Sequence, residues 1–305
     1  QAIPFYEIAH NINPNNALLN YKIGKCYILS NKFREKAMPY LEKALQLNPA
    51  VAADITYLLG SAYHYSMRFD EAIKNYRASV GRASQAKPDT INFLVMQCET
   101  GKELMENPAR VFIDNFGPII NTPDPEYAPC ISADESMIIF TSRRSTTTGG
   151  QRWDTPGEGD GLFMEDIYIA YKDESGKWQA PINPGKPLNS PEHDASVALA
   201  PDGQRLIIFR GDGGGDIFEC KLKGTAWVDP LKFDKTINTK YNEFSATYSF
   251  DGKQLFFVSD RPDGLGGRDI WVSTKDAKGK WGEPKNLGPT INTKYDEDAV
   301  FMLPD

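Results

Sequence analysis

An internal repeat of about fifty residues runs through the second half of the sequence and limits the folds it can adopt. In each unit an Asp-containing turn precedes an apolar run, an Asp-Ile-aromatic triplet follows, and a tryptophan stands three residues before a proline. The apolar runs are rich in β-branched and aromatic residues, which favour short strands joined by tight turns. A repeat at this period indicates a stacked or radial arrangement of units. The triplets begin at Asp166, Asp216 and Asp269, and the tryptophans are Trp178, Trp227 and Trp281.

Four short strands per unit, with Trp and Gly at fixed offsets, are typical of a β-propeller blade, because radial repetition hides the sheet edges. We therefore predict that residues 109–305 form part of a WD40-like β-propeller, with three blades and the start of a fourth. The ring would be truncated, so further blades are expected in the native protein. Residues 111–116 are expected to be the outer strand of the last blade, since residues 115–122 repeat the blade ending at 286–293. The predicted blades cover about residues 123–189, 190–238, 239–292 and 293–305.

The first hundred residues contain a second repeat, which is helical. Gly24 and Tyr27 recur as Gly60 and Tyr63, each pair followed by an aromatic residue and small residues at matching positions. This is the tetratricopeptide-repeat pattern, in which the glycine lets two helices touch and the tyrosine fills the seam. Apolar stripes predict a helix over 2–12, whose partner helix is missing, and a capping helix over 88–107. The chain is thus expected to begin inside a domain. The predicted fold class is α+β multidomain: a helical repeat domain at 1–108, then the incomplete propeller.

The distribution of charged residues and cysteines excludes some classes of function. Residues 1–110 carry 13 basic and 10 acidic side chains, a net charge of +3, whereas residues 111–305 carry 21 and 31, a net charge of −10. An acidic half argues against a nucleic-acid partner, because phosphate binding needs the opposite sign. No stretch approaches the roughly 20 apolar residues of a membrane helix, so no membrane span is predicted. Four widely spaced cysteines are interpreted as small core residues, with a disulfide left open.

Several longer motifs resemble a known protein family. Residues 127–135 read Tyr-Ala-Pro-Cys-Ile-Ser-Ala-Asp-Glu, and residues 140–144 read Phe-Thr-Ser-Arg-Arg. Residues 258–270 read Val-Ser-Asp-Arg-Pro-Asp-Gly-Leu-Gly-Gly-Arg-Asp-Ile. Together with the helical repeats, these motifs are similar to the PorE-like OmpA-family periplasmic proteins of Bacteroidota, whose WD40-like blades are called PD40 repeats. The resemblance covers nearly the whole chain.

The resemblance implies a periplasmic lipoprotein associated with the outer membrane, within the type IX secretion and gliding machinery. Its implied partners are a PorP/SprF-type outer-membrane protein and other secretion-system components. The family also binds peptidoglycan through a C-terminal OmpA-like domain. This sequence departs from the family pattern because it lacks the lipobox cysteine, the regulatory-like domain and the OmpA-like domain. No peptidoglycan-contacting residue is therefore transferred to it.

The sequence contains no recognisable catalytic constellation. The G-x-S-x-G, H-E-x-x-H and G-x-x-x-x-G-K-[ST] motifs are absent, and the three histidines have no partner motif. Glycine-rich runs at 211–216 and 263–269 are interpreted as turns, since their Asp spacing fits neither an EF-hand nor a tandem calcium repeat. We predict no catalytic residue, no cofactor and no metal.

A feature that is present in every unit is expected to have a structural role in the repeat, whereas a feature that is present in one unit is a candidate for a specific function. Arg143 and Arg261 follow equivalent apolar runs, as does Arg210, and we expect them to pair with the triplet aspartates. Only the first unit carries an insertion, at residues 145–161, which is polar and contains a single tryptophan. We hypothesise that this loop docks a partner, because buried aromatic residues dominate interface energies, with a plain surface loop as the alternative. The candidate partner-binding residues are Arg152, Trp153 as the anchor, Asp154, Glu158 and Asp160.

The two repeats and the absence of catalytic motifs predict a non-enzymatic scaffold that acts through protein–protein contacts. The resemblance implies that this scaffold is periplasmic and links an outer-membrane secretion or gliding complex to the cell wall. Two alternatives stay open. A propeller enzyme or carbohydrate-binding module would need convergent residues at the central channel, and none can be assigned. A cytoplasmic adaptor built on the helical repeat is also compatible with the sequence, since fold class alone does not fix function.

Overall fold

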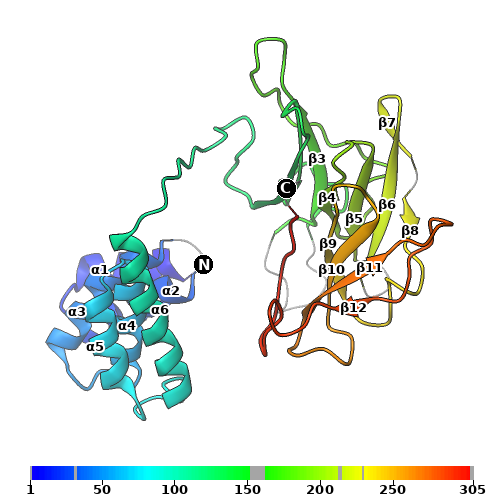
Figure 1. Cartoon of the computed structure of the whole chain (residues 1–305). Helices are drawn as coiled ribbons and strands as arrows, with labels where there is room; N and C mark the ends of the chain where they lie inside the picture. Colours follow the sequence, from blue (N-terminus) through cyan, green and yellow to red (C-terminus); the bar gives the residue numbers. More distant parts are fainter. Residues whose placement is uncertain (1, 31–32, 152–161, 212–214, 229, 303–305) are drawn as a thin grey trace. The chain divides into compact units, whose positions relative to one another are not determined.

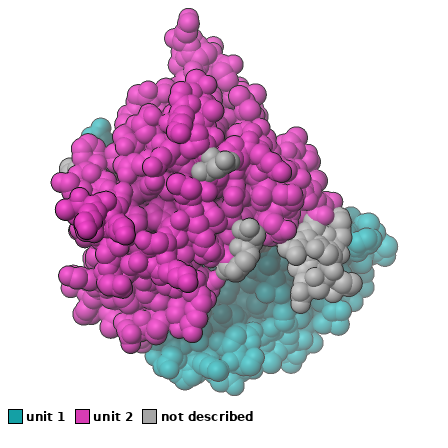
Figure 2. Space-filling model, turned by 90° about the vertical axis from the view of Figure 1, so that its right-hand side faces the viewer, with its two compact units in different colours: residues 1–113 teal, residues 114–305 magenta. Residues whose placement is uncertain are grey.

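A computed structural model describes residues 2–30, 33–151, 162–211, 215–228 and 230–302 (Figure 1). The chain divides into two compact units, Gln1–Ile113 and Asp114–Asp305, which Figure 2 shows in separate colours. The first unit is helical and the second is built from β-sheets. This order of elements confirms the predicted fold class. Over the described ranges, no helix is both long and apolar enough to cross a membrane.

The helical unit is a series of antiparallel hairpins. Helix α2 packs against α3, α4 packs against α5, and α6 packs on α5. Asn16 begins α2 by accepting a hydrogen bond from the Leu19 amide at 3.0 Å, a common way to start a helix. The helices expected at 2–12 and 88–107 are present as the first and last of the unit. The helices are α1 (Ile3–Ile12), α2 (Ala17–Leu29), α3 (Ala37–Leu47), α4 (Ile55–Tyr65), α5 (Phe69–Ser79) and α6 (Pro88–Glu106), with a 3-10 turn at Arg34–Lys36.

Two of these hairpins close over a glycine. A Cβ atom on Gly24 would lie 2.5 Å from Cγ of Leu41, and one on Gly60 would lie 2.5 Å from Cδ1 of Tyr76. Leu41 and Tyr76 are fully buried. Because protein cores are close-packed, a larger residue at either glycine would push the partner helix away. Helix contact at these two positions therefore depends on the absence of a side chain.

The second unit contains three antiparallel sheets within its described residues (Figure 1). Each sheet is formed from strands that follow one another in the sequence, with β8 pairing β6 beside the main path. The Asp-Ile-aromatic triplets begin the third strand of each sheet. The first sheet has β1 (Glu126–Ile131), β2 (Met137–Ser142) and β3 (Asp166–Tyr171). The second has β4 (Asp194–Leu199), β5 (Arg205–Arg210), β6 (Asp216–Lys223), β7 (Ala226–Trp227) and β8 (Leu231–Lys232), and the third has β9 (Glu243–Tyr248), β10 (Gln254–Ser259), β11 (Asp269–Thr274) and β12 (Lys285–Asn286).

Successive sheets pack face to face, which is the arrangement of propeller blades. Ile139 and Ile167 of the first sheet share a buried cluster with Ile208 of the second. Ile217 of the second sheet shares another cluster with Phe257 of the third. The middle strand β2 of the first sheet is covered on both faces, because all six of its residues are buried.

Polar contacts join β4 of the second sheet to β1 and β2 of the first. The Ser196 amide of β4 donates to Oγ1 of Thr141 in β2 at 2.9 Å, and the Ser196 hydroxyl donates to the Ala128 carbonyl of β1 at 2.8 Å. Ser196 and Thr141 are buried, at 2% and 0% exposed. These hydrogen bonds fix how the first two sheets sit against each other, because buried polar groups need partners.

Candidate functional site

One face of the helical unit carries two stripes of side chains, one from α2 and one from α4. Members of each stripe are four residues apart, which places them on the same side of their helix. The two helices are in contact. Leu29 and Tyr65 at the ends of the stripes are 71% and 45% exposed, so the face is open to solvent at that end, whereas Ser61 in the middle of the α4 stripe is buried. The stripes are Tyr21, Lys25 and Leu29 on α2, and Tyr57, Ser61 and Tyr65 on α4.

A hydrogen-bonded network connects the α2 stripe to Asp54, the residue that precedes α4. The Tyr21 hydroxyl donates to Oδ1 of Asp54 at 2.7 Å, and Nζ of Lys25 donates to Oδ2 of Asp54 at 2.9 Å. Lys25 Nζ also donates to the Tyr21 hydroxyl oxygen at 3.0 Å. Burial acts to raise the pKa of Asp54, but the hydrogen bonds from Lys25 and Tyr21 outweigh it and hold that pKa below its ordinary value. Hydrogen bonds to Tyr21 and Asp54 likewise raise the pKa of Lys25, so both charges persist at neutral pH.

A second cation lies at the Tyr65 end of the face. The Arg34 guanidinium is 4.8 Å from the centre of the Tyr65 ring, and Nη1 of Arg34 donates to the Tyr65 hydroxyl at 2.9 Å. A stacked arginine and aromatic rings held by hydrogen bonds present flat apolar area with fixed polar atoms beside it. Such a surface suits the backbone and side chains of a peptide segment. Sequence reasoning missed this network, because Tyr21 and Asp54 are 33 residues apart.

The tyrosines singled out by the repeat pattern lie in the hairpin seams. Tyr27 is 7% exposed and its hydroxyl donates to Oε1 of Glu7 at 2.7 Å. The Tyr63 hydroxyl donates to Oε1 of Glu42 at 2.6 Å. Burial, supported by the neighbouring carboxylates, raises the pKa of each tyrosine to about 12. Both phenols therefore remain neutral and serve as packing residues with a polar end.

In the propeller unit, an asparagine at the end of each sheet binds the backbone of the third strand. Asn189 accepts from the Ile167 amide at 2.9 Å and donates to the Ile167 carbonyl at 2.9 Å. Asn238 makes the same pair of bonds with Ile217, at 3.1 and 2.8 Å. Asn292 makes them with Ile270, at 2.8 and 2.9 Å. We call this arrangement the asparagine clamp. It was not predicted, although the recurrence of Asn followed by Thr or Ser signals it.

The expected pairing of arginines with the triplet aspartates is wrong. Arg210 and Arg261 instead reach the acidic residue that begins the first strand of their own sheet, and we call this pair the acid–arginine latch. In the first sheet the latch uses Arg144, while Arg143 donates to the Phe163 carbonyl at 2.6 Å and lies 3.8 Å from Glu165. The latches are Arg144–Glu126 at 3.1 Å, Arg210–Asp194 at 3.1 Å and Arg261–Glu243 at 3.2 Å.

The triplet aspartates hold neighbouring loops and strands. Oδ2 of Asp166 accepts from the Thr148 amide at 2.6 Å and from its hydroxyl at 2.7 Å. Oδ2 of Asp269 accepts from the Leu265 amide at 2.7 Å. Asp216 pairs with Nζ of Lys232 on β8 at 2.5 Å. Local backbone amides, the Thr148 hydroxyl and one lysine therefore bind one oxygen of each carboxylate that was expected to bind arginine. Among the described residues, Oδ1 of Asp166 and Oδ1 of Asp269 are buried without a hydrogen-bond partner.

The insertion of the first sheet is anchored at its base by Asp166 and by an antiparallel bridge between Gln151 and Phe163. The proposed docking residues Arg152, Trp153, Asp154, Glu158 and Asp160 lie outside the described residues.

The repeated tryptophans pack on the outer parts of the sheets. Trp178 and Trp281 each form a bridge to the lysine that directly follows the third strand, Lys172 and Lys275. Nζ of these lysines lies 5.0 and 4.4 Å from the respective ring centres. Trp227 is 7% exposed within the cluster between the first two sheets. Their contacts are those of packing residues.

The described residues offer no metal cluster of three or more His, Cys, Asp or Glu side chains. All four cysteines are free, and three are buried. Burial raises the pKa of Cys98 to about 11 and those of Cys130 and Cys220 to about 12. These thiols stay protonated at neutral pH and are poor nucleophiles, because the thiolate is the reactive form.

Comparisons with known proteins match parts of the chain. Residues 17–51 match the family model described as a tetratricopeptide repeat. No curated protein sequence matches the chain. Similar solved structures include TolB from Acinetobacter baumannii, with 19% identity, a TM-score of 0.32, and coverage of 53% of this chain and 32% of that one.

Two further solved structures are similar to part of the chain. The periplasmic gluconolactonase of Pseudomonas aeruginosa has 14% identity and a TM-score of 0.33, over 57% of this chain and 61% of its own. The β-propeller domain of the Trilobed protease from Pyrococcus furiosus has 12% identity and a TM-score of 0.30, over 53% of this chain and 42% of its own. The chain thus spans less than two thirds of each of these proteins.

Proposed function

We propose that this protein is a non-enzymatic scaffold whose helical unit binds a segment of a partner protein. The observation that carries the proposal is the face of α2 and α4, where Tyr21, Lys25 and Asp54 are ordered by direct hydrogen bonds. Residues 17–51, which include α2, match a tetratricopeptide repeat. Arrays of such repeats expose an extended binding surface.

The partner segment follows from the chemistry of this face. Tyr21, Tyr57 and Tyr65 offer aromatic area at low entropic cost, and such residues commonly supply most of an interface's binding energy. The Lys25 ammonium is already held in place by Asp54 at 2.9 Å, so binding costs little side-chain ordering there. Residues 1–110 carry a net charge of +3. A segment with apolar side chains and an acidic group fits these features best.

We further propose that the protein acts in the periplasm, at the outer membrane, as part of a type IX secretion or gliding complex. The support is the resemblance of residues 127–135, 140–144 and 258–270 to PorE-like OmpA-family proteins. On this proposal the partner is a PorP/SprF-type outer-membrane protein, and the propeller unit offers a second docking surface that includes Trp153. Attachment to the cell wall would use an OmpA-like domain of the native protein.

Affinity purification after mild crosslinking of detergent-solubilised cell envelopes tests both proposals. The native protein should recover an outer-membrane protein of the PorP/SprF type. Recovery should fall at least tenfold with Tyr21→Ala/Tyr57→Ala. Lys74→Ala, on an exposed part of α5, is the control and should leave recovery unchanged. Unchanged recovery by the double variant with a native melting temperature would refute the α2–α4 face as the site.

The same capture with Trp153→Ala tests the loop separately, since it changes the propeller unit and leaves the helical unit intact. Capture of other proteins, lost with Tyr21→Ala/Tyr57→Ala, would support the scaffold and refute the secretion partner. Capture of no protein at all would refute the scaffold itself.

A further inference from the structure

Two buried carboxyl or amide oxygens in the propeller unit lack the partners that their counterparts have. Among the described residues, Oδ1 of Asn121 and Oε2 of Glu297 are buried without a hydrogen-bond partner. Asn121 precedes the first sheet and Glu297 follows the third. A buried polar atom left unpaired costs about 1–3 kcal/mol, so each marks a place where a partner is expected.

Asn121 occupies the position of the asparagine clamp. Asn189, Asn238 and Asn292 each accept a backbone amide from the third strand of the sheet before them, 21 or 22 residues earlier. The residues at that distance before Asn121 lie in helix α6. No local strand can therefore fill this clamp, and its strand has to come from a distant part of a propeller.

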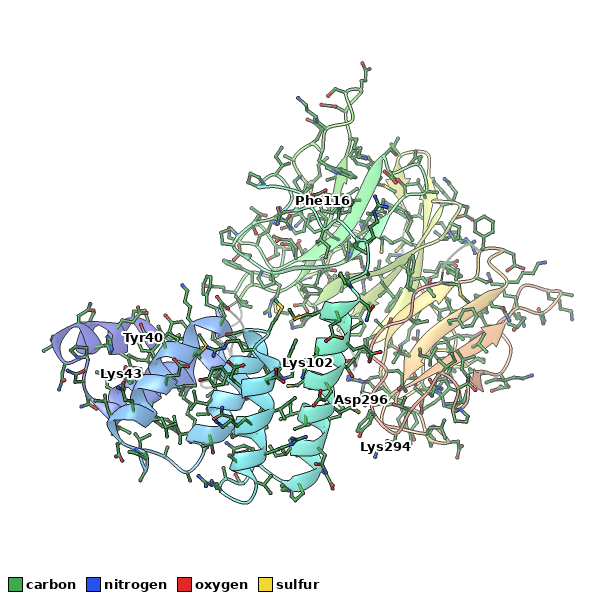
Figure 3. All side chains as sticks on the ribbon, turned by 60° about the vertical axis from the view of Figure 1, so that its left-hand side comes forward. Tyr40, Lys43, Lys102, Phe116, Lys294 and Asp296 are labelled. Carbon is green, nitrogen blue, oxygen red and sulfur yellow. The ribbon has the colours of Figure 1, made fainter. Side chains whose placement is uncertain are left out.

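The turn that precedes Asn121 is already formed. Oδ1 of Asn115 accepts from the Gly117 amide at 2.7 Å, as Asn286 does from Gly288 at 2.8 Å at the end of the third sheet. Phe116 lies against Trp178 of the first sheet, with ring centres 5.8 Å apart (Figure 3 labels Phe116). The segment that carries the Asn121 clamp is therefore held on the first sheet by its own contacts, without the strand that the clamp would bind.

Residues 111–116, expected as an outer strand, form no strand in the structure. Val111, Phe112 and Ile113 are 65%, 86% and 93% exposed. Three consecutive exposed apolar residues favour a segment that another strand covers.

Glu297 occupies the acid position of an acid–arginine latch. Thr293 donates its amide and hydroxyl to Oε1 of Glu297 at 3.1 and 2.7 Å, as Thr239 donates to Glu243. The Glu297 amide donates to the Arg268 carbonyl at 2.9 Å and the Val300 amide to Oγ of Ser245 at 3.3 Å, so this segment is seated on the third sheet. Lys294 and Asp296 of the same segment are labelled in Figure 3. At Glu243 the remaining partners are the Ser259 hydroxyl and Arg261, both from the second strand of that sheet or directly after it, and Glu297 has no counterpart of either among the described residues.

We propose that these two ends are docking surfaces for further strands of the same repeat, supplied by the same polypeptide. At Glu297 the occupant is a second strand carrying an arginine, because the arginines of the three formed latches follow their acids by 16 or 18 residues in one sheet. At Asn121 the occupant is the third strand of the last blade, beginning with an Asp-Ile-aromatic triplet. The clamp and the latch then close the ring.

Paired substitutions in the native polypeptide and in the 305-residue chain test the clamp. In the native polypeptide Asn121→Ala should lower the melting temperature as much as Asn238→Ala does, by about 5 °C or more. In the 305-residue chain Asn238→Ala should have this effect and Asn121→Ala should have none. A neutral Asn121→Ala in both proteins would refute the proposal. A melting temperature that rises with protein concentration would show that a second copy supplies the strand, and would refute the single-polypeptide source.

An extended chain tests the latch independently. Asp305 corresponds to Asp251 in the repeat, so a second copy of residues 252–275 appended after Asp305 continues the register. Glu297→Gln should be neutral in the 305-residue chain and should lower the melting temperature of the extended chain. The matched control is the same extended chain in which the appended copy of Arg261, and not the original, is changed to Ala. In this control Glu297→Gln should again be neutral. An equal response of both extended chains to Glu297→Gln would refute the latch.

Discussion

Asn189 binds both backbone polar groups of Ile167, with its Oδ1 and Nδ2 atoms each 2.9 Å from the amide nitrogen and carbonyl oxygen. Asn189 is 1% exposed and Ile167 is fully buried. The side chain takes the place of a paired strand at the edge of β3 and leads the chain into the second sheet. One side chain therefore provides hydrogen-bond partners for the amide and carbonyl of Ile167 at the edge of β3, at the point where the chain passes from one blade to the next.

Asn189→Asp should destabilise the propeller unit strongly although it is isosteric. The substitution removes the Nδ2 donor to the Ile167 carbonyl and to Oδ1 of Asn183 at 2.7 Å. Two lost hydrogen bonds and a buried unpaired carbonyl give an expected loss of about 2–4 kcal/mol in the free energy of unfolding. Urea denaturation followed by tryptophan fluorescence measures it, and a loss below about 0.5 kcal/mol would contradict the clamp.

Removal of one partner of a buried latch should cost far more than removal of a partner of an exposed ion pair. In the Arg261–Glu243 latch the side chains are 11% and 0% exposed. Arg261→Ala leaves the Glu243 carboxylate buried without its cation, so we expect a loss of about 3–5 kcal/mol. Lys253→Ala breaks an ion pair whose side chains are 75% and 55% exposed, and should change stability by less than about 1 kcal/mol. Equal effects of the two variants in chemical denaturation would show that the latch is not a structural element.

Gly24→Ala should destabilise the helical unit by about 1–3 kcal/mol despite the better helix propensity of alanine. The added Cβ would lie 2.5 Å from Cγ of Leu41, which is fully buried. Leu41→Ala alone should cost about 2–5 kcal/mol because it leaves a cavity. The double variant should cost less than the sum of the two, because the alanine at 41 removes the clash. Circular dichroism at the helical wavelength during urea unfolding measures this coupling, and strict additivity would argue against the contact.

The helical unit should lose stability in acid partly through Asp54. Its pKa in the folded protein is below its ordinary value, because hydrogen bonds from Lys25 and Tyr21 outweigh the effect of burial. A carboxylate with a depressed folded pKa stabilises the protein fully above its unfolded pKa of about 4, and that contribution is lost as the pH falls through the folded pKa. Asp54→Asn should therefore lower the urea midpoint at pH 7 and flatten its dependence on pH between about 5 and 3. Parallel pH profiles for the two proteins would contradict this.

Alkylation should distinguish the buried thiols from the accessible one. Burial raises the pKa of Cys98, Cys130 and Cys220 to about 11 or 12, and all three side chains are buried. Iodoacetamide at pH 8 should modify at most Cys26, which is partly exposed, in the folded protein. All four should react in denaturant. Rapid modification of a second cysteine under native conditions, seen by intact mass and peptide mapping, would contradict the packing.

Several features of the fold follow from local sequence patterns. Gly24 and Gly60 identify helix contacts, because only glycine allows such close approach, and the structure places a buried side chain against each. The Asp-Ile-aromatic triplets identify the start of the third strand in all three sheets. These features repeat at fixed spacing, and a repeated local pattern produces the same local structure each time.

The polar partners depended on the tertiary structure. The sequence pattern suggested that Arg261 would pair with Asp269, whereas folding brings it to Glu243, 18 residues earlier in the chain. Tyr21 and Asp54 meet only because α2 and α4 pack together, and Asn189 reaches Ile167 only because the chain returns to the edge of β3. Periodicity in one dimension determines which residues build helices and strands. The choice of hydrogen-bond partner is decided by strand register and side-chain direction in three dimensions, since several donors and acceptors of the same chemistry compete for each buried group.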